Sequence, residues 1–186
     1  RVTENNEVSR SDAGVKEKDV GSSVQDGGIL LKKSAVPASR LAEIAFKPFA
    51  AQFAERNISV SLNLPHTLPY LVCDIAKVAW VLSIFLSNAV RYTPEWGKLN
   101  VSASLLNAKL RIAVENSGYG ISIESAERMF TRVENESAIE FGQGLALILA
   151  REIIEAHGGL IGVESELGVM TRFYFEIPIE NTTLRT

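Results

Sequence analysis

The stretch Ser87-Asn88-Ala89-Val90-Arg91-Tyr92-Thr93-Pro94 is the most informative part of the chain, because it joins a long apolar helix to a polar turn. The helix is predicted to begin after Asp74, whose carboxylate suits an N-cap, and to run through Arg91. Spacings of three or four residues predict its buried face, which consists of Val78, Leu82, Phe85 and Ala89. The helix therefore carries polar side chains out of the core at its C-terminal end.

A second stripe on the same helix indicates ligand chemistry. It consists of Lys77, Trp80, Ile84, Asn88 and Arg91. The amide oxygen of Asn88 suits Mg²⁺, which prefers oxygen ligands and shares its coordination with phosphates and water. Arg91 can reach phosphate oxygens, and Tyr92 offers an aromatic face to a flat ring. Asn88 alone would fit a solvated helix end, but the whole string favours a nucleotide site.

Three further segments join an apolar element to a glycine-containing turn. They are Glu115-Asn116-Ser117-Gly118-Tyr119-Gly120-Ile121, Gly142-Gln143-Gly144-Leu145-Ala146-Leu147 and Gly168-Val169-Met170-Thr171-Arg172-Phe173. Glycines in the first permit positive φ and let the backbone approach a flat ring. The pair Gly142 and Gly144 opens a predicted helix, whose unpaired N–H groups favour phosphate. We predict one nucleotide pocket assembled from four distant segments.

The order and wording of these segments resemble the N, G1, G2 and G3 boxes of the ATP-binding catalytic domain of sensor histidine kinases. That family shares its fold with gyrase, MutL-type and heat-shock-chaperone ATPases. The resemblance covers roughly residues 28–178. It implies an α+β two-layer sandwich, the Bergerat ATP-binding fold, in which three main helices cover one face of a mixed β-sheet. It also implies ATP and Mg²⁺ as ligands and a histidine protein kinase activity.

The resemblance assigns roles to residues that match box positions. The implied catalytic residues are Asn88, Arg91 and Arg132, and the implied metal ligand is Asn88. The implied nucleotide-binding residues are Asn88, Arg91, Tyr92, Asn116, Gly118, Gly120, Ile121, Gly142, Gly144, Leu145 and Thr171. Met129-Phe130-Thr131-Arg132 resembles the F box. The residues between Phe130 and Gly142 match the ATP lid, from which Arg132 can reach a phosphate.

Four positions depart from the family's usual residues. Ile84 stands where Asn, or Glu in the wider superfamily, is usual, while Ala146 and Met170 replace glycines. Asn116 replaces an Asp that accepts a hydrogen bond from the adenine amino group, and it can still accept without the charge. These departures leave open a degenerate domain that acts as a regulatory scaffold. An ATP-hydrolysing member of the superfamily is disfavoured by Ile84 and by the kinase-like ending His157-Gly158-Gly159.

Neither histidine has the sequence context of a phosphoacceptor. His66 lies between prolines in a predicted turn and His157 ends a predicted helix, so we expect structural roles for both. The resemblance then implies an acceptor histidine on a separate dimerisation domain of the parent kinase. It also implies a response regulator that receives the phosphate afterwards.

Composition favours one acidic domain with flanking tails. The 186 residues are 46% hydrophobic, and the net charge of −3 gives no reason to expect nucleic acid as a partner. Residues 1–26 lack Leu, Ile and aromatic residues, so they are predicted to be a polar linker or disordered tail. The catalytic domain is expected at 27–180 and a C-terminal tail at 181–186.

The compartment is predicted from the cysteine content and hydropathy. Cys73 is the single cysteine and cannot form an internal disulfide, which fits the cytoplasm. No apolar run approaches the ~20 residues that span a bilayer. We expect no direct membrane contact from this chain, even if the parent protein is membrane-anchored.

Periodicity and turn residues predict the remaining elements. Strands are expected at 28–33, 58–62, 99–105, 109–114, 160–164 and 172–177, with a hairpin turn around Asn107. Helices are expected at 39–55, with a kink near Pro48, and at 74–91, 126–130 and 144–157. The inward residues of the first helix are expected to be Leu41, Ile44, Phe49 and Phe53.

Overall fold

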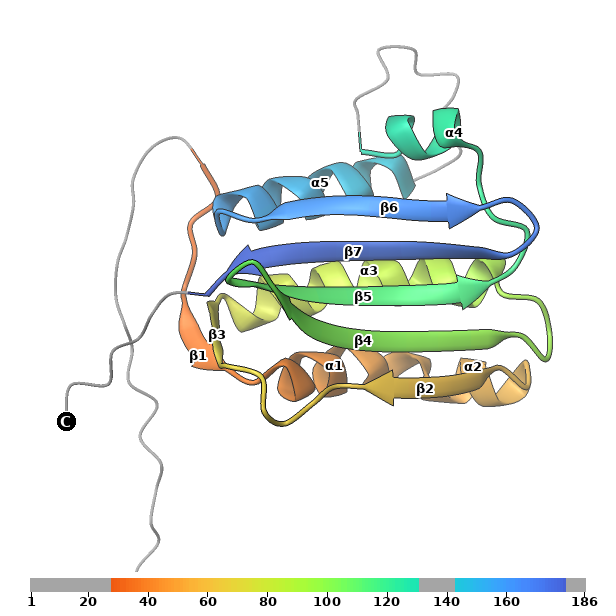
Figure 1. Ribbon diagram of the computed structural model, residues 1–186, viewed down its shortest axis with the longest axis horizontal. Helices are drawn as coiled ribbons and strands as arrows, with labels where there is room; N and C mark the ends of the chain where they lie inside the picture. The colour runs from red at the N-terminus through yellow and green to blue at the C-terminus, as the bar shows by residue number, and fades with distance from the viewer. Residues whose placement is uncertain (1–27, 131–142, 180–186) are drawn as a thin grey trace, which may run out of the picture.

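The computed structural model describes residues 28–130 and 143–179 of the chain. Figure 1 shows the longer strands side by side across the molecule, with helices behind them. The elements in chain order are β1 (Ser34–Val36), α1 (Ala38–Phe46), η1 (Lys47–Phe49), α2 (Ala50–Glu55), β2 (Ser59–Asn63), β3 (Leu71–Cys73), α3 (Ile75–Tyr92), β4 (Lys98–Leu106), β5 (Lys109–Ser117), α4 (Ile123–Arg128), α5 (Gln143–Ala156), β6 (Leu160–Glu166) and β7 (Met170–Pro178).

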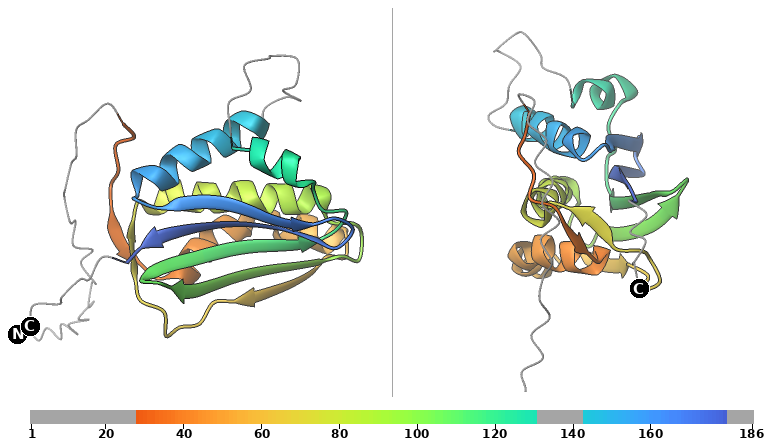
Figure 2. Two further views of the ribbon diagram at one scale, coloured as in Figure 1. Left: turned by 45° about the horizontal axis from the view of Figure 1, so that its top comes forward. Right: turned by 90° about the vertical axis from the view of Figure 1, so that its left-hand side faces the viewer.

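Five strands form the main sheet in the order β2-β4-β5-β7-β6. The sheet is mixed, because β2 pairs with β4 in parallel and the other neighbours are antiparallel. Helices α1, α3 and α5 lie on one face of it, and the end-on view in Figure 2 shows the two layers. A separate two-stranded sheet joins β1 to β3. The expected α+β two-layer sandwich is confirmed.

Helix α3 lies at the centre of the helical layer and packs on α1, α5 and β5. Its predicted core stripe is at most 1% exposed and consists of Val78, Leu82, Phe85 and Ala89. The Phe85 ring stacks on Phe173 of β7 with 5.3 Å between centroids. Burial of such a side chain contributes about 1.5–3 kcal/mol. Among the described residues, α3 is the one helix long and apolar enough to cross a membrane, but its apolar stripe forms the core of this domain.

The predicted kink near Pro48 is confirmed. The 3₁₀ turn η1 separates α1 from α2 there, because proline lacks the N–H that a continuous α-helix needs. Leu41 and Phe53 are buried as predicted, and Phe49 is half-buried. Ile44 is 38% exposed, so its prediction as a core residue is wrong. The reason is that α1 packs on α3 through a face made of Leu41 and alanines.

The prediction of a strand at 28–33 is wrong, and the first strand begins at Ser34 instead. Its partner β3 is not among the predicted strands. Both strands contain three residues, which is too short for an alternation of apolar and polar residues to show. The backbone N–H of Lys32 donates to the Asp74 carboxylate at 3.0 Å rather than to a strand. The other five strands lie where predicted, with ends that differ by up to three residues.

Turn and cap residues set two further boundaries. The β4–β5 hairpin turns at Asn107 and Ala108, whose φ values of 49° and 59° are those a tight two-residue hairpin requires. Helix α4 begins at Ile123, earlier than predicted. The hydroxyl of Ser122 explains this start, because it accepts a hydrogen bond from Ser125 N at 3.2 Å and caps the helix.

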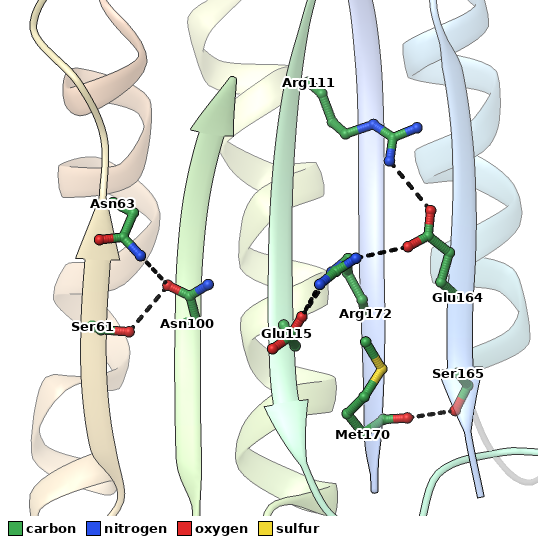
Figure 3. A network of polar contacts seen from close by, with 9 residues as sticks. All are labelled: Ser61, Asn63, Asn100, Arg111, Glu115, Glu164, Ser165, Met170 and Arg172. Carbon is green, nitrogen blue, oxygen red and sulfur yellow. Dashed lines mark hydrogen bonds and ion pairs between the residues drawn. The ribbon is translucent and has the colours of Figure 1, made fainter. Parts of the chain in front are cut away.

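The face of the sheet away from the helices, called the open face below, carries a network of ion pairs across β5, β7 and β6 (Figure 3). Arg172 pairs with Glu115 and, at 2.9 Å, with Glu164. Arg111 pairs with Glu164 at 3.2 Å and with Glu176 at 2.6 Å. Each arginine is therefore shared between two carboxylates, and Glu164 links the two arginines.

Candidate functional site

The C-terminal end of α3 presents the polar side chains of the first segment. Asn88 is buried at 7% exposed, whereas Arg91 and Tyr92 are exposed. The Arg91 guanidinium lies 5.7 Å from the centroid of the Tyr92 ring. Thr93 ends the helix, because its N–H and its hydroxyl both donate to the carbonyl of Ala89, at 2.9 and 2.5 Å. The segment thus turns sharply where Arg91 and Tyr92, two of the predicted site residues, are exposed.

The Asn88 amide makes no hydrogen bond with any described residue, although its side chain is largely buried. Leaving a buried amide unpaired costs free energy in a folded protein. No fully buried side-chain nitrogen or oxygen among the described residues lacks a partner, so this amide remains in contact with solvent. The Asn88 amide is thus held in place by the helix without a hydrogen-bond partner among the described residues.

A second buried amide lies on the neighbouring strand. Asn116 of β5 is 4% exposed and lies opposite Thr171 of β7, which is 6% exposed. The side-chain nitrogen of Asn116 donates to the carbonyl of Ser117 at 3.1 Å. This bond fixes the orientation of the amide and leaves its oxygen without a hydrogen-bond partner among the described residues.

The glycines of the second segment hold it between two other segments. A Cβ atom at Gly118 would lie 2.7 Å from the Tyr92 carbonyl, and one at Gly120 would collide with the Glu166 carbonyl. Gly118 N also donates to the Val169 carbonyl at 3.2 Å. The close approach that was predicted for these glycines is therefore made to backbone. It brings three of the four segments together at one end of the sheet.

Ser165 of β6 is a supporting residue that the sequence analysis missed. Its hydroxyl accepts from Ile121 N at 2.9 Å and donates to the Met170 carbonyl at 2.8 Å. It also contacts the Thr171 hydroxyl at 3.1 Å. A signal was present in the sequence, because Ser165 occupies the helix-facing position two residues after Val163, where an apolar residue would be expected.

These segments enclose a small cavity of about 40 Å³. Its lining consists of Tyr92, Asn116, Tyr119, Gly120, Ile121, Met129, Thr171 and Phe173. Pockets that hold drug-sized ligands typically measure about 300–1,000 Å³. A purine ring would therefore require an outward movement of the lining, whose most exposed members are Tyr119 at 84% and Tyr92 at 49%.

A larger groove of about 560 Å³ lies between α4, α5 and β6. Of the predicted site residues it contains Ile121 alone. Its rim carries the ion pair of Arg151 with Glu155 at 2.7 Å, which is solvent-exposed. Five predicted site residues line the smaller cavity instead, namely Tyr92, Asn116, Gly120, Ile121 and Thr171.

The remaining predicted residues lie in different places. Arg132, Gly142 and the whole predicted lid between Phe130 and Gly142 lie outside the described residues. Gly144 lies in the first turn of α5, and Leu145 beside it is 57% exposed and does not line the cavity. Asn88, Arg91 and Gly118 are also absent from the lining. Ile84 packs against the hydrophobic core, which gives this departure from the family a packing role.

The opposite end of α3 is held by hydrogen bonds to Asp74. The Asp74 carboxylate accepts from Lys32 N at 3.0 Å, from Lys77 N at 3.1 Å and from Lys77 Nζ at 2.8 Å. Burial opposes its ionisation, but these hydrogen bonds outweigh burial and hold the pKa of Asp74 below its ordinary value. The predicted N-cap is confirmed.

His157, at the end of α5, completes that junction. Its Nδ1–H donates to the Ile153 carbonyl at 2.7 Å, so its Nε2 accepts from Asp74 N at 3.0 Å. The ring is 5% exposed, and burial lowers its pKa. The structural role predicted for this histidine is confirmed. His66 lies in an exposed turn.

Comparison with known proteins identifies the class to which this fold and site correspond. Residues 73–181 match the family model described as histidine kinase-, DNA gyrase B-, and HSP90-like ATPase. The chain belongs to this family. The expectation drawn from the four segments is therefore confirmed at the level of family and fold.

Curated relatives narrow the comparison to sensor kinases. The chain is 36% identical over 131 residues to the adaptive-response sensory kinase SasA of Thermosynechococcus vestitus. This match covers 68% of this chain and 34% of that protein. It is also 36% identical over 124 residues to the alginate biosynthesis sensor protein KinB of Pseudomonas aeruginosa, covering 67% and 21% respectively. The chain thus spans about a third of the first relative and about a fifth of the second.

Solved structures agree with that comparison. The nucleotide-free catalytic domain of histidine kinase ThkA superposes with a TM-score of 0.69 at 28% identity, covering 78% of this chain and 95% of that one. Full-length ShkA, solved in complex with AMPPNP, superposes with a TM-score of 0.71 at 27% identity, covering 82% and 32%. ThkA in complex with the response regulator TrrA superposes with a TM-score of 0.68 at 26% identity, covering 81% and 43%.

Proposed function

We propose that this chain is the catalytic domain of a sensor histidine kinase, which binds Mg²⁺-ATP and presents the γ-phosphate to a histidine on a separate dimerisation domain. The observation that carries the proposal is the pair of buried amides, Asn88 and Asn116, at the same end of the fold. Each retains an oxygen without a hydrogen-bond partner among the described residues. Family membership supports ATP as the ligand.

The residues divide the work between base and phosphates. Asn116 accepts a hydrogen bond from the adenine amino group, while Tyr92 and Tyr119 offer aromatic faces to the ring. Arg91 and the first turn of α5, which contains Gly144, favour the phosphates by charge and by unpaired N–H groups. Catalysis is then mainly a matter of positioning and charge neutralisation.

The residues present fit a magnesium ion. The described residues contain no cluster of three His, Cys, Asp or Glu that would hold a metal ion by itself. Asn88 provides one oxygen ligand, and nucleotide phosphates and water complete such a site. The ion, when bound, neutralises charge on the phosphates.

The partners and the compartment belong to the same proposal. A response regulator would receive the phosphate from the dimerisation domain, and the complex of ThkA with TrrA supports this class of partner. We place the domain, at 27–180, in the cytoplasm between two tails. Cys73 is free and buried, and burial is the main reason that its pKa is raised to about 12, which keeps the thiol protonated and unreactive.

A calorimetric titration of the chain with ATP, in Mg²⁺ and in chelator, tests the proposal. We expect saturable binding that Mg²⁺ strengthens. Incubation with γ-labelled ATP should leave the isolated chain unlabelled, and acid-labile label on His66 or His157 would contradict the proposed separate acceptor.

The small cavity and the neutral Asn116 favour one alternative, a regulatory scaffold that does not bind nucleotide. Absence of ATP binding at millimolar concentration would support that alternative over the kinase domain. Binding that is strengthened by Mg²⁺ would exclude it.

A further inference from the structure

Arg56 lies outside α3 and hydrogen-bonds to the C-terminal end of this helix. The last carbonyls of a helix have no partner within it and must find one elsewhere. Arg56 donates from one guanidinium nitrogen to the Val90 carbonyl and from the other to the Thr93 carbonyl, the second at 2.7 Å. The planar fork of arginine suits two neighbouring acceptors, and its charge lies at the negative end of the helix.

Backbone hydrogen bonds beside Arg56 add to the contact with this part of the chain. Arg56 lies between α2 and β2, and its carbonyl accepts from Trp96 N at 3.2 Å. Three residues later, Ser59 N donates to the Gly97 carbonyl at 2.9 Å. The stretch 56–59 thus holds the stretch 90–97 through the Arg56 side chain and through backbone on both sides.

The gripped carbonyls flank the residues proposed to bind nucleotide. Val90 and Thr93 bracket Arg91 and Tyr92 in the sequence. The Tyr92 carbonyl lies against Gly118, so close that a Cβ atom there would be 2.7 Å away. The Tyr92 side chain lines the small cavity together with Asn116. A shift of the last turn of α3 would therefore move one wall of the cavity.

We propose that Arg56 is a positioning residue for the nucleotide site. It holds the last turn of α3 so that Tyr92 and the Gly118 turn keep the base-binding wall in place. This inference rests on the proposed function, because it assigns Arg56 to the same site. Arg56 is not among the residues that line the cavity, so it acts through the backbone of Val90 and Thr93.

The test compares Arg56→Gln, Arg56→Lys and the control Arg40→Gln, which removes an exposed arginine paired with Glu43 at 2.8 Å. Affinity for ATP, ADP and adenosine is measured at a temperature where each variant is fully folded. A loss worth about one charge-assisted hydrogen bond predicts about tenfold weaker binding for Arg56→Gln. Arg56→Lys should lie between Arg56→Gln and the wild type, because an ammonium can reach one carbonyl, and the control should bind as the wild type does.

The pattern across ligands separates positioning from other roles. Positioning of the base-binding wall predicts weaker binding of adenosine as well as of ADP and ATP, and the two nucleotides should lose more because Arg91 lies in the same turn. Weaker binding of ATP with unchanged binding of adenosine would mean that Arg56 does not hold the base-binding wall, and would overturn the inference. Unchanged affinity in a folded Arg56→Gln would also overturn it. If Arg56→Gln does not fold, unchanged affinity in Arg56→Lys assigns Arg56 to stability alone.

Hydrogen exchange of the amides at 90–97 tests, without any ligand, whether Arg56 holds the C-terminal end of α3. These amides should exchange faster in Arg56→Gln than in Arg40→Gln, and equal exchange would overturn the inference. If the wild type binds no nucleotide, the proposed function fails. The exchange result then still decides whether Arg56 holds the helix end.

Discussion

The two ends of α3 differ in how their polar groups are satisfied. At the N-terminal end, the Asp74 carboxylate accepts three hydrogen bonds and its N–H donates to His157. At the C-terminal end, the amide of Asn88 has no partner among the described residues, and Arg91 is exposed. Buried polar groups in native proteins are normally hydrogen-bonded. The N-terminal end is therefore a hydrogen-bonded junction, whereas the C-terminal end leaves an amide open to solvent, as the proposed nucleotide site requires.

The largest effect is expected from losing the hydrogen bonds at the N-terminal end of α3. Asp74→Ala deletes an N-cap and leaves the N–H of Lys32 without its acceptor, which should lower the free energy of unfolding by about 2–3 kcal/mol. Urea denaturation measures this loss. ATP affinity of the folded variant should stay close to that of the wild type. A large loss of affinity would show that the two ends are not separate in function.

Asn88→Ala tests the C-terminal end of α3. Loss of a metal ligand should weaken ATP binding in Mg²⁺ by about 1–3 kcal/mol, by analogy with the cost of an unpaired polar group. Binding in chelator should change far less, and stability should not fall. Asn63→Ala is the matched control, because Asn63 lies exposed on β2, where its amide bonds to Asn100. Equal losses with and without Mg²⁺ would mean that Asn88 supports the fold instead.

His157, at the N-terminal end of α3, should also make the free energy of unfolding depend on pH. Burial lowers the pKa of His157 below its ordinary value of 6.5, although the bond to Ile153 opposes the shift. The unfolded chain therefore binds more protons in the interval between the two pKa values, and stability rises with pH there. This stability is present above about pH 6.5 and is lost as the pH falls toward the folded pKa.

A glutamine in place of His157 isolates this effect. His157→Gln keeps an acceptor for Asp74 N but does not titrate, so it should flatten the slope of stability below pH 6.5 by at most about 1.4 kcal/mol per pH unit. His66→Gln, in an exposed turn, is the matched control for the substitution itself. An unchanged slope in His157→Gln would assign the pH dependence to other groups.

The smallest effect is expected at Asn116. Asn116→Asp turns a neutral hydrogen bond to the adenine amino group into a charge-assisted one, a gain of about 1 kcal/mol that desolvation of the new charge reduces. GTP presents a carbonyl at that position of its ring, so its binding should weaken. Fluorescence titration with both nucleotides measures the change. No change for either would show that Asn116 does not contact the base and would favour the scaffold.

The sequence predicted well where the determinants are local. The cap at Asp74, the break at Pro48 and the turn at Asn107 each depend on a few adjacent residues, and the structure confirms all three. The four segments also named most of the cavity lining, including Tyr92 and Asn116. The expected fold followed from the resemblance carried by those segments.

The rest depends on contacts between residues far apart in sequence. Arg56 lies 34 residues before Val90, and no pattern around it indicates that it would hold that carbonyl. His157 and Asp74 are 83 residues apart, so a structural histidine could be expected without its partner being identified. Strand β3 has three buried residues and no alternation to reveal it.

The network on the open face has a consequence for the response of the domain to heat. Its two arginines and three glutamates remain partly hydrated, between 8% and 42% exposed, so at room temperature such pairs contribute little. Hydration of charged groups becomes less favourable as temperature rises, which lowers the cost of bringing them together. The network therefore strengthens on warming, while the hydrophobic contribution per unit area levels off.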